Sequence, residues 1–333
     1  MGGMAPHTHD AIDWADRLPA LRRADELQAP VYADIATRLV APLGPRPVIV
    51  DVGCGAGGMS SAFAAALARR GGGTLVLADA VPELLDTAQT VANAAVARAA
   101  GPRHADSARA QAELDAASSA ASVGRVQPGP DAIATSAASV AVDRVQADVA
   151  SVDLDHLVPK ADLVWASSMV HHLPDQQAGV AGLVTALMPG GVLALVEGSP
   201  PTFCLPWDLG LGAPGLERRM LAARDQRFEQ MRAEMAGAAR MPYGWNVALH
   251  KAGLERVGAF SFLVDRPAPP DQTVRDYVVE HVSWLYSDVA ELLSQNDRDV
   301  LNALLDPADE SYLGRRDDIF VLGVKTIHFG FRR

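Results

Sequence analysis

VIVDVGCGAGGMS, residues 48–60, is the stretch that decides the fold of this chain. Its apolar start predicts a buried β-strand, and Asp51, Gly53, Gly55 and Gly57 follow in the order D-x-G-x-G-x-G. Glycines at a sharp turn let the backbone approach a ligand that side chains would block. The helix expected next would direct its N-terminal amides and the positive end of its dipole toward the same ligand. The stretch therefore predicts a ligand site between a strand and a helix.

The acid at the end of this strand bears on what the ligand is. Asp51 is less usual beside a pyrophosphate and better suited to a ligand with an ammonium group or hydroxyls. The glycines at 53, 55 and 58 also satisfy G-x-G-x-x-G, so nicotinamide adenine dinucleotide (NAD) remains a competing ligand. Asp79 ends the next predicted strand, where an acid can accept both hydroxyls of a ribose. That geometry serves either ligand.

Composition narrows the class of protein. The chain has 333 residues, 49% of them hydrophobic, yet we find no run approaching the roughly 18 apolar residues of a membrane span. The N-terminal residues lack the pattern of a secretory signal, and two cysteines cannot build a disulfide framework, so we expect a cytoplasmic protein. A net charge of −11 argues against a nucleic acid or an anionic membrane as partner. The oligomeric state stays open, with a homodimer among the options.

Strand-like and helix-like segments alternate through the first two-thirds of the chain, which predicts a mostly parallel sheet. The expected strands are Pro47–Val52, Thr74–Asp79, Arg144–Asp148, Asp162–Ala166 and Gly191–Glu197. The helices expected between them are Ser60–Arg70, Pro82–Ala100 and Gln176–Leu187.

Two regions break this alternation. Residues 101–143 are rich in Ala, Ser, Gly and Asp and predict a surface insertion with little to bury. Residues 199–318 predict a helical cap with a sixth strand at about 257–264, and residues 319–333 predict a final strand. Residues 1–43 are expected to add helices to the cap, so the core of the fold spans 44–198.

Five segments in order, DVGCGAGG, LADA, QADV, DLVWASSMVHHLPD and LMPGGVLALVEG, resemble the motifs of class I S-adenosylmethionine (SAM)-dependent methyltransferases. The resemblance covers about 44–198, and the C-terminal part resembles actinobacterial methyltransferases that act on small molecules, mostly of unassigned structure. It implies an α/β fold: a doubly wound, seven-stranded, Rossmann-like sheet of order 3-2-1-4-5-7-6, mostly parallel, with an additional helical cap. It also implies SAM as cofactor, lying across the carboxyl ends of strands one, two and four.

Carried over by position, the resemblance assigns residues to parts of SAM. Asp51 with the backbone of Gly53, Gly55 and Gly57 would hold the methionine part. The remaining assignments are Asp79 with Ala80 for the ribose, Asp148 with Val149 for the adenine, and Ser167 beside the sulfonium. We also expect Tyr32, in a helix-like segment before the first strand, to contact the SAM carboxylate.

His171 and His172 follow the fourth predicted strand and are the candidate catalytic residues. A neutral imidazole near the transferring methyl can act as a general base for a hydroxyl or amine, although an HH-L-x-D run is also partly a signature of the fold. No Cys/His spacing supports a metal site.

The predicted function is methyl transfer from SAM to an O, N or C nucleophile of a small molecule, and we expect this molecule to be a specialised metabolite. Three alternatives remain: an NAD-dependent oxidoreductase, a SAM-fold enzyme that cyclises SAM or transfers its aminocarboxypropyl arm, and a non-catalytic SAM-binding protein.

Overall fold

A computed structural model of the chain describes residues 14–100, 139–148 and 154–333. In these residues one sheet has the order β3-β2-β1-β4-β5-β7-β6, which confirms the predicted topology. Pairing is parallel from β3 to β5, and β7 runs antiparallel to both of its neighbours. The strands are β1 (Val48–Val52), β2 (Gly73–Asp79), β3 (Val140–Gln146), β4 (Ala161–Ser167), β5 (Leu187–Val196), β6 (Glu255–Arg266) and β7 (Val321–Phe331).

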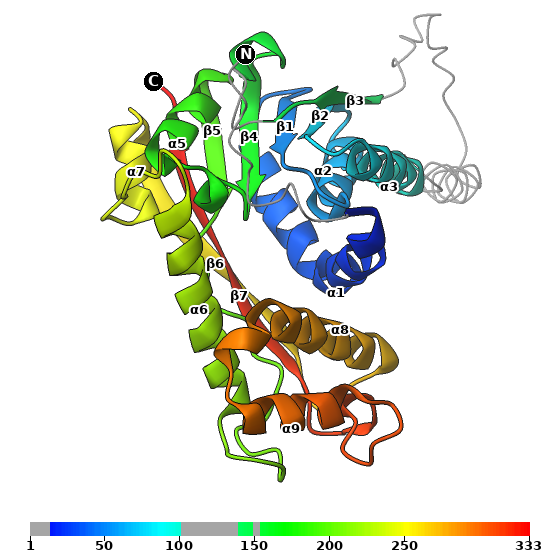
Figure 1. The fold of residues 1–333 in the computed structure, drawn as a ribbon. Coiled ribbons are helices and arrows are strands. Elements are labelled where there is room, and N and C mark those ends of the chain that lie inside the picture. The colour runs from blue at the N-terminus through cyan, green and yellow to red at the C-terminus, as the bar shows by residue number, and fades with distance from the viewer. Residues whose placement is uncertain (1–13, 101–138, 149–153) are drawn as a thin grey trace, which may run out of the picture.

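Helices cover both faces of the sheet (Figure 1). One face packs against α1 (Trp14–Val40), α2 (Gly58–Arg69) and α3 (Pro82–Ala100), and the other against α5 (Gln176–Thr185) and α7 (Trp245–Lys251). The central strands are therefore apolar on both sides, as in other buried parallel sheets. In β1, Ile49 joins the core on the α1 side and Val50 joins the core on the opposite side.

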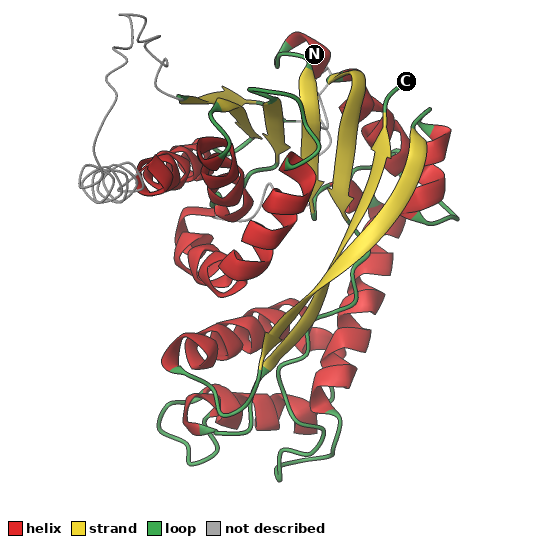
Figure 2. Cartoon of the chain, turned by 180° about the vertical axis from the view of Figure 1, so that it is seen from behind, coloured by secondary structure: helices red, strands yellow, loops and turns green. Residues whose placement is uncertain are grey.

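The β6–β7 hairpin is longer than the sheet that it completes. β7 pairs with β5 only over Ile327–Phe331, where Ile327 lies opposite Val196 at the carboxyl end of β5. Residues 321–326 of β7 pair with β6, and with Phe203 through a single bridge at Leu322, and continue past that end; we call them the β7 overhang. Figure 2 shows this hairpin running from the sheet into a second group of helices. The overhang therefore carries those helices to the edge where doubly wound sheets bind ligands.

This second group, the cap, consists of α6 (Leu216–Glu234), α8 (Gln272–Val289) and α9 (Gln295–Leu305). It has a hydrophobic core of its own, to which α1 contributes Leu27. Arg23 of α1 also forms ion pairs of 3.0 Å with Asp276 and Glu280 of α8. Helix α1 thus contacts both the sheet and the cap.

The structure changes several predicted boundaries. β3 begins at Val140, four residues before the predicted Arg144, so residues 140–143 belong to the sheet and not to the insertion. An edge strand needs only one apolar face, and the alternate side chains of Val140 and Val142 supply it. The sixth strand, predicted at 257–264, spans Glu255–Arg266, because Glu255 pairs with Phe331 at one end and Asp265 and Arg266 pair with the overhang at the other. Within 1–43 the described residues 14–40 form one helix, and the insertion at 101–138 lies outside the described residues.

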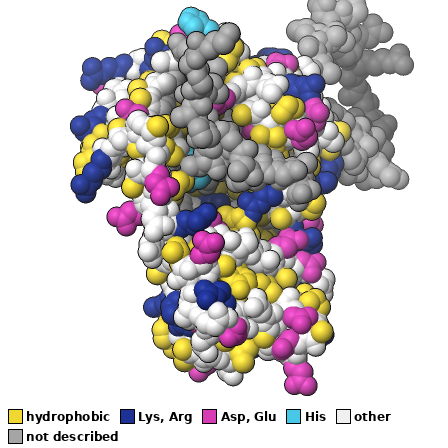
Figure 3. Space-filling view, viewed as in Figure 1, with side chains coloured by type: hydrophobic (Ala, Val, Ile, Leu, Met, Phe, Trp, Pro, Cys, Tyr) yellow, Lys and Arg dark blue, Asp and Glu magenta, His cyan; other side chains and the backbone are white. Residues whose placement is uncertain are grey.

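None of the helices in the described ranges is both long enough and apolar enough to cross a membrane. In the space-filling view of Figure 3, acidic and basic side chains are interspersed over the visible face.

Candidate functional site

The glycine turn after β1 has the backbone conformation that its sequence predicts. Gly53, Gly55 and Gly57 have φ values of 68°, 54° and 88°, in the left-handed region that favours glycine. The Gly53 amide donates to the Ala78 carbonyl oxygen at 2.8 Å, which ties the turn to β2. At Gly57 an added Cβ would lie 2.6 Å from the Ala88 Cα of α3. The turn is therefore both glycine-dependent and closely packed.

Asp79 lies against this turn, as predicted for a ribose-binding acid. Its Oδ2 accepts a hydrogen bond from the Gly55 amide at 3.0 Å, and its Oδ1 accepts one from the Val81 amide at 3.1 Å. Burial raises the pKa of the Asp79 carboxyl above its ordinary value. Ala80 follows at an exposed position, where its carbonyl oxygen accepts from the Gln146 side chain at 3.2 Å.

Asp51 lies under the turn and is only 2% exposed. Its Oδ2 accepts a hydrogen bond from the Ser60 hydroxyl of α2 at 2.5 Å. Burial, with smaller repulsion from Asp79 and Asp25, raises the pKa of Asp51 to about 7. The side chain is thus held inside the protein, on the face of the sheet covered by α1 and α2.

Helix α1 brings a third acid to the same place. Burial raises the pKa of Asp25 to about 6, against the lowering effects of the Gly58 amide, the Lys325 charge and the Tyr32 hydroxyl. Tyr32 is half-buried, and desolvation together with Asp25 raises the pKa of its phenol. Asp25, Asp51 and Asp79 therefore bring three carboxyl groups to the glycine turn, and a cationic ligand would stabilise their ionised forms.

The other predicted cofactor residues lie along the same edge of the sheet. Asp148 lies two residues after the end of β3. The amide of the preceding Ala147 donates to the Asp79 carbonyl oxygen at 2.9 Å, which places Asp148 near the end of β2. Ser167 ends β4, next to the end of β1. Val149 lies outside the described residues. The sheet thus brings the candidates from β1, β2, β3 and β4 to one edge.

His171 and His172 lie further along that edge, in the 3-10 turn Val170–His172 after β4. The Nδ1 atom of His171 lies 2.6 Å from Oε2 of Glu197, whose side chain is fully buried at the end of β5. The other oxygen of Glu197 accepts from the Met169 and Val170 amides at 2.9 and 2.7 Å. The two imidazole centroids are 3.9 Å apart. The structure thus provides a histidine oriented by a buried carboxylate.

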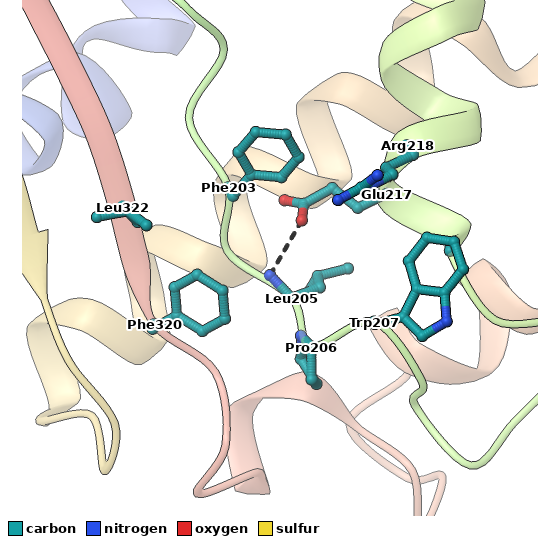
Figure 4. A pocket seen from close by; sticks show the side chains of 9 residues that line it. Phe203, Leu205, Pro206, Trp207, Glu217, Arg218, Phe320 and Leu322 are labelled. Carbon is teal, nitrogen blue, oxygen red and sulfur yellow. Dashed lines mark hydrogen bonds between the residues drawn. The ribbon is translucent and has the colours of Figure 1, made fainter.

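An apolar hollow of about 220 Å³ lies elsewhere, in the cap (Figure 4). Phe203, Trp207 and Leu322 line it, and Glu217 accepts from the Leu205 amide at 3.2 Å beside it. Because side chains alternate along a strand, Leu322 and Lys325 point to opposite faces of β7. The hollow therefore opens on the face of the hairpin away from α1 and the glycine turn, and we do not assign it to the reaction.

Three residues of this region were not among the predicted site residues. Glu197 follows the same pattern as Asp51 and Asp79, an acid at the carboxyl end of a strand, so the sequence did contain its signal. Asp25 and Lys325 have no comparable signal. They approach the turn only because α1 and β7, far apart in sequence, pack beside it.

The profile of a family described as "Methyltransferase domain" matches residues 24–257. Comparison with curated proteins gave no significant match. Among solved structures, a proposed methyltransferase from Bacillus halodurans C-125 is 15% identical, with 89% of this chain and 96% of that chain covered and a TM-score of 0.43.

Two further solved structures are similar at the same level. A SAM-dependent methyltransferase from Thiobacillus denitrificans, in complex with S-adenosyl-L-homocysteine, is 14% identical with 90% of each chain covered and a TM-score of 0.40. A proposed sarcosine dimethylglycine methyltransferase from Galdieria sulphuraria is 15% identical, with 92% of this chain and 85% of that chain covered and a TM-score of 0.37.

Proposed function

This chain belongs to the methyltransferase-domain family, and on that premise we propose that it methylates an O, N or C nucleophile of a small molecule, with SAM as its cofactor. The observation that carries the proposal is the gathering of three acids, Asp25, Asp51 and Asp79, around the glycine turn at the carboxyl edge of the sheet. Two of the cofactor's groups, an ammonium and a sulfonium, are cations, and its ribose offers two hydroxyls to a carboxylate.

The residues at the edge of the sheet fit this cofactor, which supplies an electrophilic methyl group on sulfur when bound. Asp79 would accept hydrogen bonds from the ribose hydroxyls, and Asp148 would accept one from the exocyclic amino group of the adenine. The glycine turn leaves room for the methionine part, because a Cβ at Gly55 would meet nothing within 4 Å. An acid-lined site of this kind stabilises positive charge, which supports SAM over a dinucleotide with a pyrophosphate.

The cap supports a small molecule as the acceptor. Helix α6 runs from the cap to the turn that holds the histidines, where Arg232 donates to the Leu173 carbonyl oxygen at 2.6 Å. An acceptor at the edge of the sheet would therefore be enclosed between the cap and the sheet, which excludes water from the nucleophile. The net charge of −11 also disfavours an RNA or DNA acceptor.

His171 is the best-placed general base of this edge. A hydrogen bond from its Nδ1 to the Glu197 carboxylate leaves Nε2 as the atom that can take a proton from an acceptor hydroxyl or amine. Phe228 of α6 lies with its ring centroid 5.9 Å from that of His171 and is 38% exposed, so an apolar surface adjoins the imidazole. This arrangement favours His171 over His172 as the residue that accepts the proton.

The function can be tested with SAM that carries a deuterated methyl group. The protein is incubated with this cofactor and a panel of hydroxyl, amine and carbon-nucleophile metabolites, and mass spectrometry detects a product heavier by one labelled methyl group. We expect such a product together with S-adenosylhomocysteine, and we expect the Asp79→Ala variant to lose most of both.

Other outcomes would favour the alternatives. Methylthioadenosine as the only product derived from SAM would indicate cyclisation of SAM or transfer of its aminocarboxypropyl arm. Tight SAM binding with no product from any acceptor would indicate a binding protein. Calorimetry that detects NAD binding and no SAM binding would overturn the assignment to methyl transfer.

A further inference from the structure

One face of α1 presents polar side chains to the glycine turn. Asp25, Gln28 and Tyr32 are spaced i, i+3 and i+7, so they lie on the same side of the helix. Asp25 reaches Gly58 at the start of α2, since a Cβ added there would lie 2.4 Å from its Oδ1. The Oε1 atom of Gln28 is buried and has no hydrogen-bond partner among the described residues. A buried acceptor without a partner points to a donor supplied by a ligand.

A cation approaches this face from the β7 overhang. Lys325 lies two residues before Ile327 on β7, so their side chains point to the same face of the strand. Ile327 packs in the core with Ile35 of α1, which places the Lys325 side chain on the α1 side of the hairpin. Burial lowers the pKa of its ammonium, and the Asp25 carboxylate offsets part of that effect. No hydrogen bond or ion pair within 4 Å holds this ammonium in the described part of the chain. It is therefore available to an anion.

We propose that α1 and the β7 overhang form a clamp for the α-amino-acid end of SAM, in which Asp25 and Gln28 accept from its ammonium and Lys325 donates to its carboxylate. The inference rests on the proposed function, because it names the residues that hold one end of that cofactor.

The charges of the clamp match those of the ligand. An α-amino acid carries one positive and one negative group on the same carbon, and the clamp offers one carboxylate and one ammonium that already influence each other. Its position matches as well, because Asp25 contacts the helix that begins at the end of the glycine turn. Asp51, the residue expected to bind the ammonium, is instead enclosed with Ser60. In the clamp, Asp25 therefore takes the place of Asp51 as the carboxylate that binds the SAM ammonium.

An acceptor carboxylate is the other anion that Lys325 could bind. The cofactor is favoured because Lys325 and the Gly58 amide both act on the same carboxyl group, Asp25, which places the lysine beside the glycine turn. A comparison of ligands separates the two sources. S-adenosylhomocysteine has both charged groups, its decarboxylated analogue keeps the ammonium alone, and methylthioadenosine has neither.

The experiment measures the dissociation constants of these three ligands by calorimetry at pH 7.5 for the full chain and its variants. Lys325→Met is expected to weaken S-adenosylhomocysteine about tenfold to a hundredfold, as for the loss of a charge-assisted hydrogen bond, and to leave the other two ligands unchanged. Asp25→Asn should weaken both ligands that carry the ammonium and spare methylthioadenosine. Lys251→Met, at a lysine that lies 4.8 Å from the Tyr243 ring, is the matched control and should change nothing.

Each result tests either the clamp alone or the proposed methyl transfer on which the clamp rests. Unchanged binding of S-adenosylhomocysteine by Lys325→Met would overturn the clamp and leave the lysine for an acceptor. An equal loss of all three ligands would also overturn it, because that pattern indicates damage to the fold. If the unaltered protein bound none of the three, the proposed function itself would fail.

Discussion

The carboxyl group of Asp25 fills the space that a side chain on Gly58 would need. A Cβ added at residue 58 would lie 2.3 Å from Asp25 Cγ, closer than non-bonded atoms approach. The contact joins α1 to the first residue of α2, directly after the glycine turn. The last glycine of the GAGG run is therefore required by a neighbouring helix, and its role differs from that of the glycines within the turn.

Gly58→Ala should displace Asp25 from the start of α2. We expect weaker binding of S-adenosylhomocysteine by about tenfold, consistent with loss of one hydrogen bond to a charged group, and a lower melting temperature. Gly182→Ala is the control, because residue 182 lies within α5 and a Cβ there would meet nothing within 4 Å. That variant should gain up to about 1 kcal/mol in free energy of unfolding and bind normally. Equal behaviour of the two variants would contradict the contact.

Two glycines of the turn should respond differently to alanine. Gly55→Ala places a methyl group in open space at a φ of 54°, so we expect a cost of about 1–2 kcal/mol from the left-handed backbone alone. Gly57→Ala adds a contact of 2.6 Å with the Ala88 Cα, which is backbone and cannot rotate away. Urea unfolding should show a clearly larger loss for residue 57. A larger loss at residue 55 would refute this account of the turn.

The buried Asp51 makes stability depend on pH in a defined direction. Burial raises its pKa from 3.8 to about 7, so the folded protein holds this proton more tightly than the unfolded chain. Its contribution to stability is present at low pH and is lost as the pH rises from about 4 through 7. Asp51→Asn removes the titration, so we expect the variant to gain stability relative to the unaltered protein between pH 5 and pH 8. The upper limit of this gain between the two pH values is about 3 kcal/mol, and thermal melts at pH 5 and pH 8 measure it.

A difference in melting temperature that stays constant between pH 5 and pH 8 would show that Asp51 does not titrate in this range. Asp25, with a pKa of about 6, has the same direction of effect and is present in both proteins, so the difference reports Asp51 together with the smaller repulsion that it shares with Asp25 and Asp79.

The order of the sheet was predicted through the resemblance to methyltransferases, and the motifs that carry this resemblance are local. The glycine turn follows an apolar strand, and Asp51 and Asp79 each mark the end of a strand whose register places both at one edge. The Pro82–Ala100 helix was predicted with its observed bounds, since a proline opens it and small apolar residues continue it.

The arrangement of the cap could not be predicted because it depends on tertiary contacts. Nothing local indicates that β7 pairs with β5 over five residues and then continues past β5 while still paired with β6. That overhang brings Lys325 toward Asp25, some 300 residues earlier in the chain. Glu197 was a different case, since its strand was predicted, but its partner His171 became evident only in three dimensions.

Glu197→Gln should invert the proton positions on His171. The Glu197 oxygen that accepts from the Met169 and Val170 amides would be replaced by the Gln carbonyl oxygen, so the NH2 group of the Gln side-chain amide would face His171 Nδ1. Nδ1 would then accept, Nε2 would carry the proton, and the imidazole could no longer act as a base through Nε2. We expect kcat to fall about a hundredfold or more, with the affinity for S-adenosylhomocysteine unchanged.

Nitrogen-15 NMR of the imidazole should report the changed tautomer, and His172→Gln should keep most of the activity. Full activity in Glu197→Gln, or a greater loss in His172→Gln than in His171→Gln, would exclude His171 as the base.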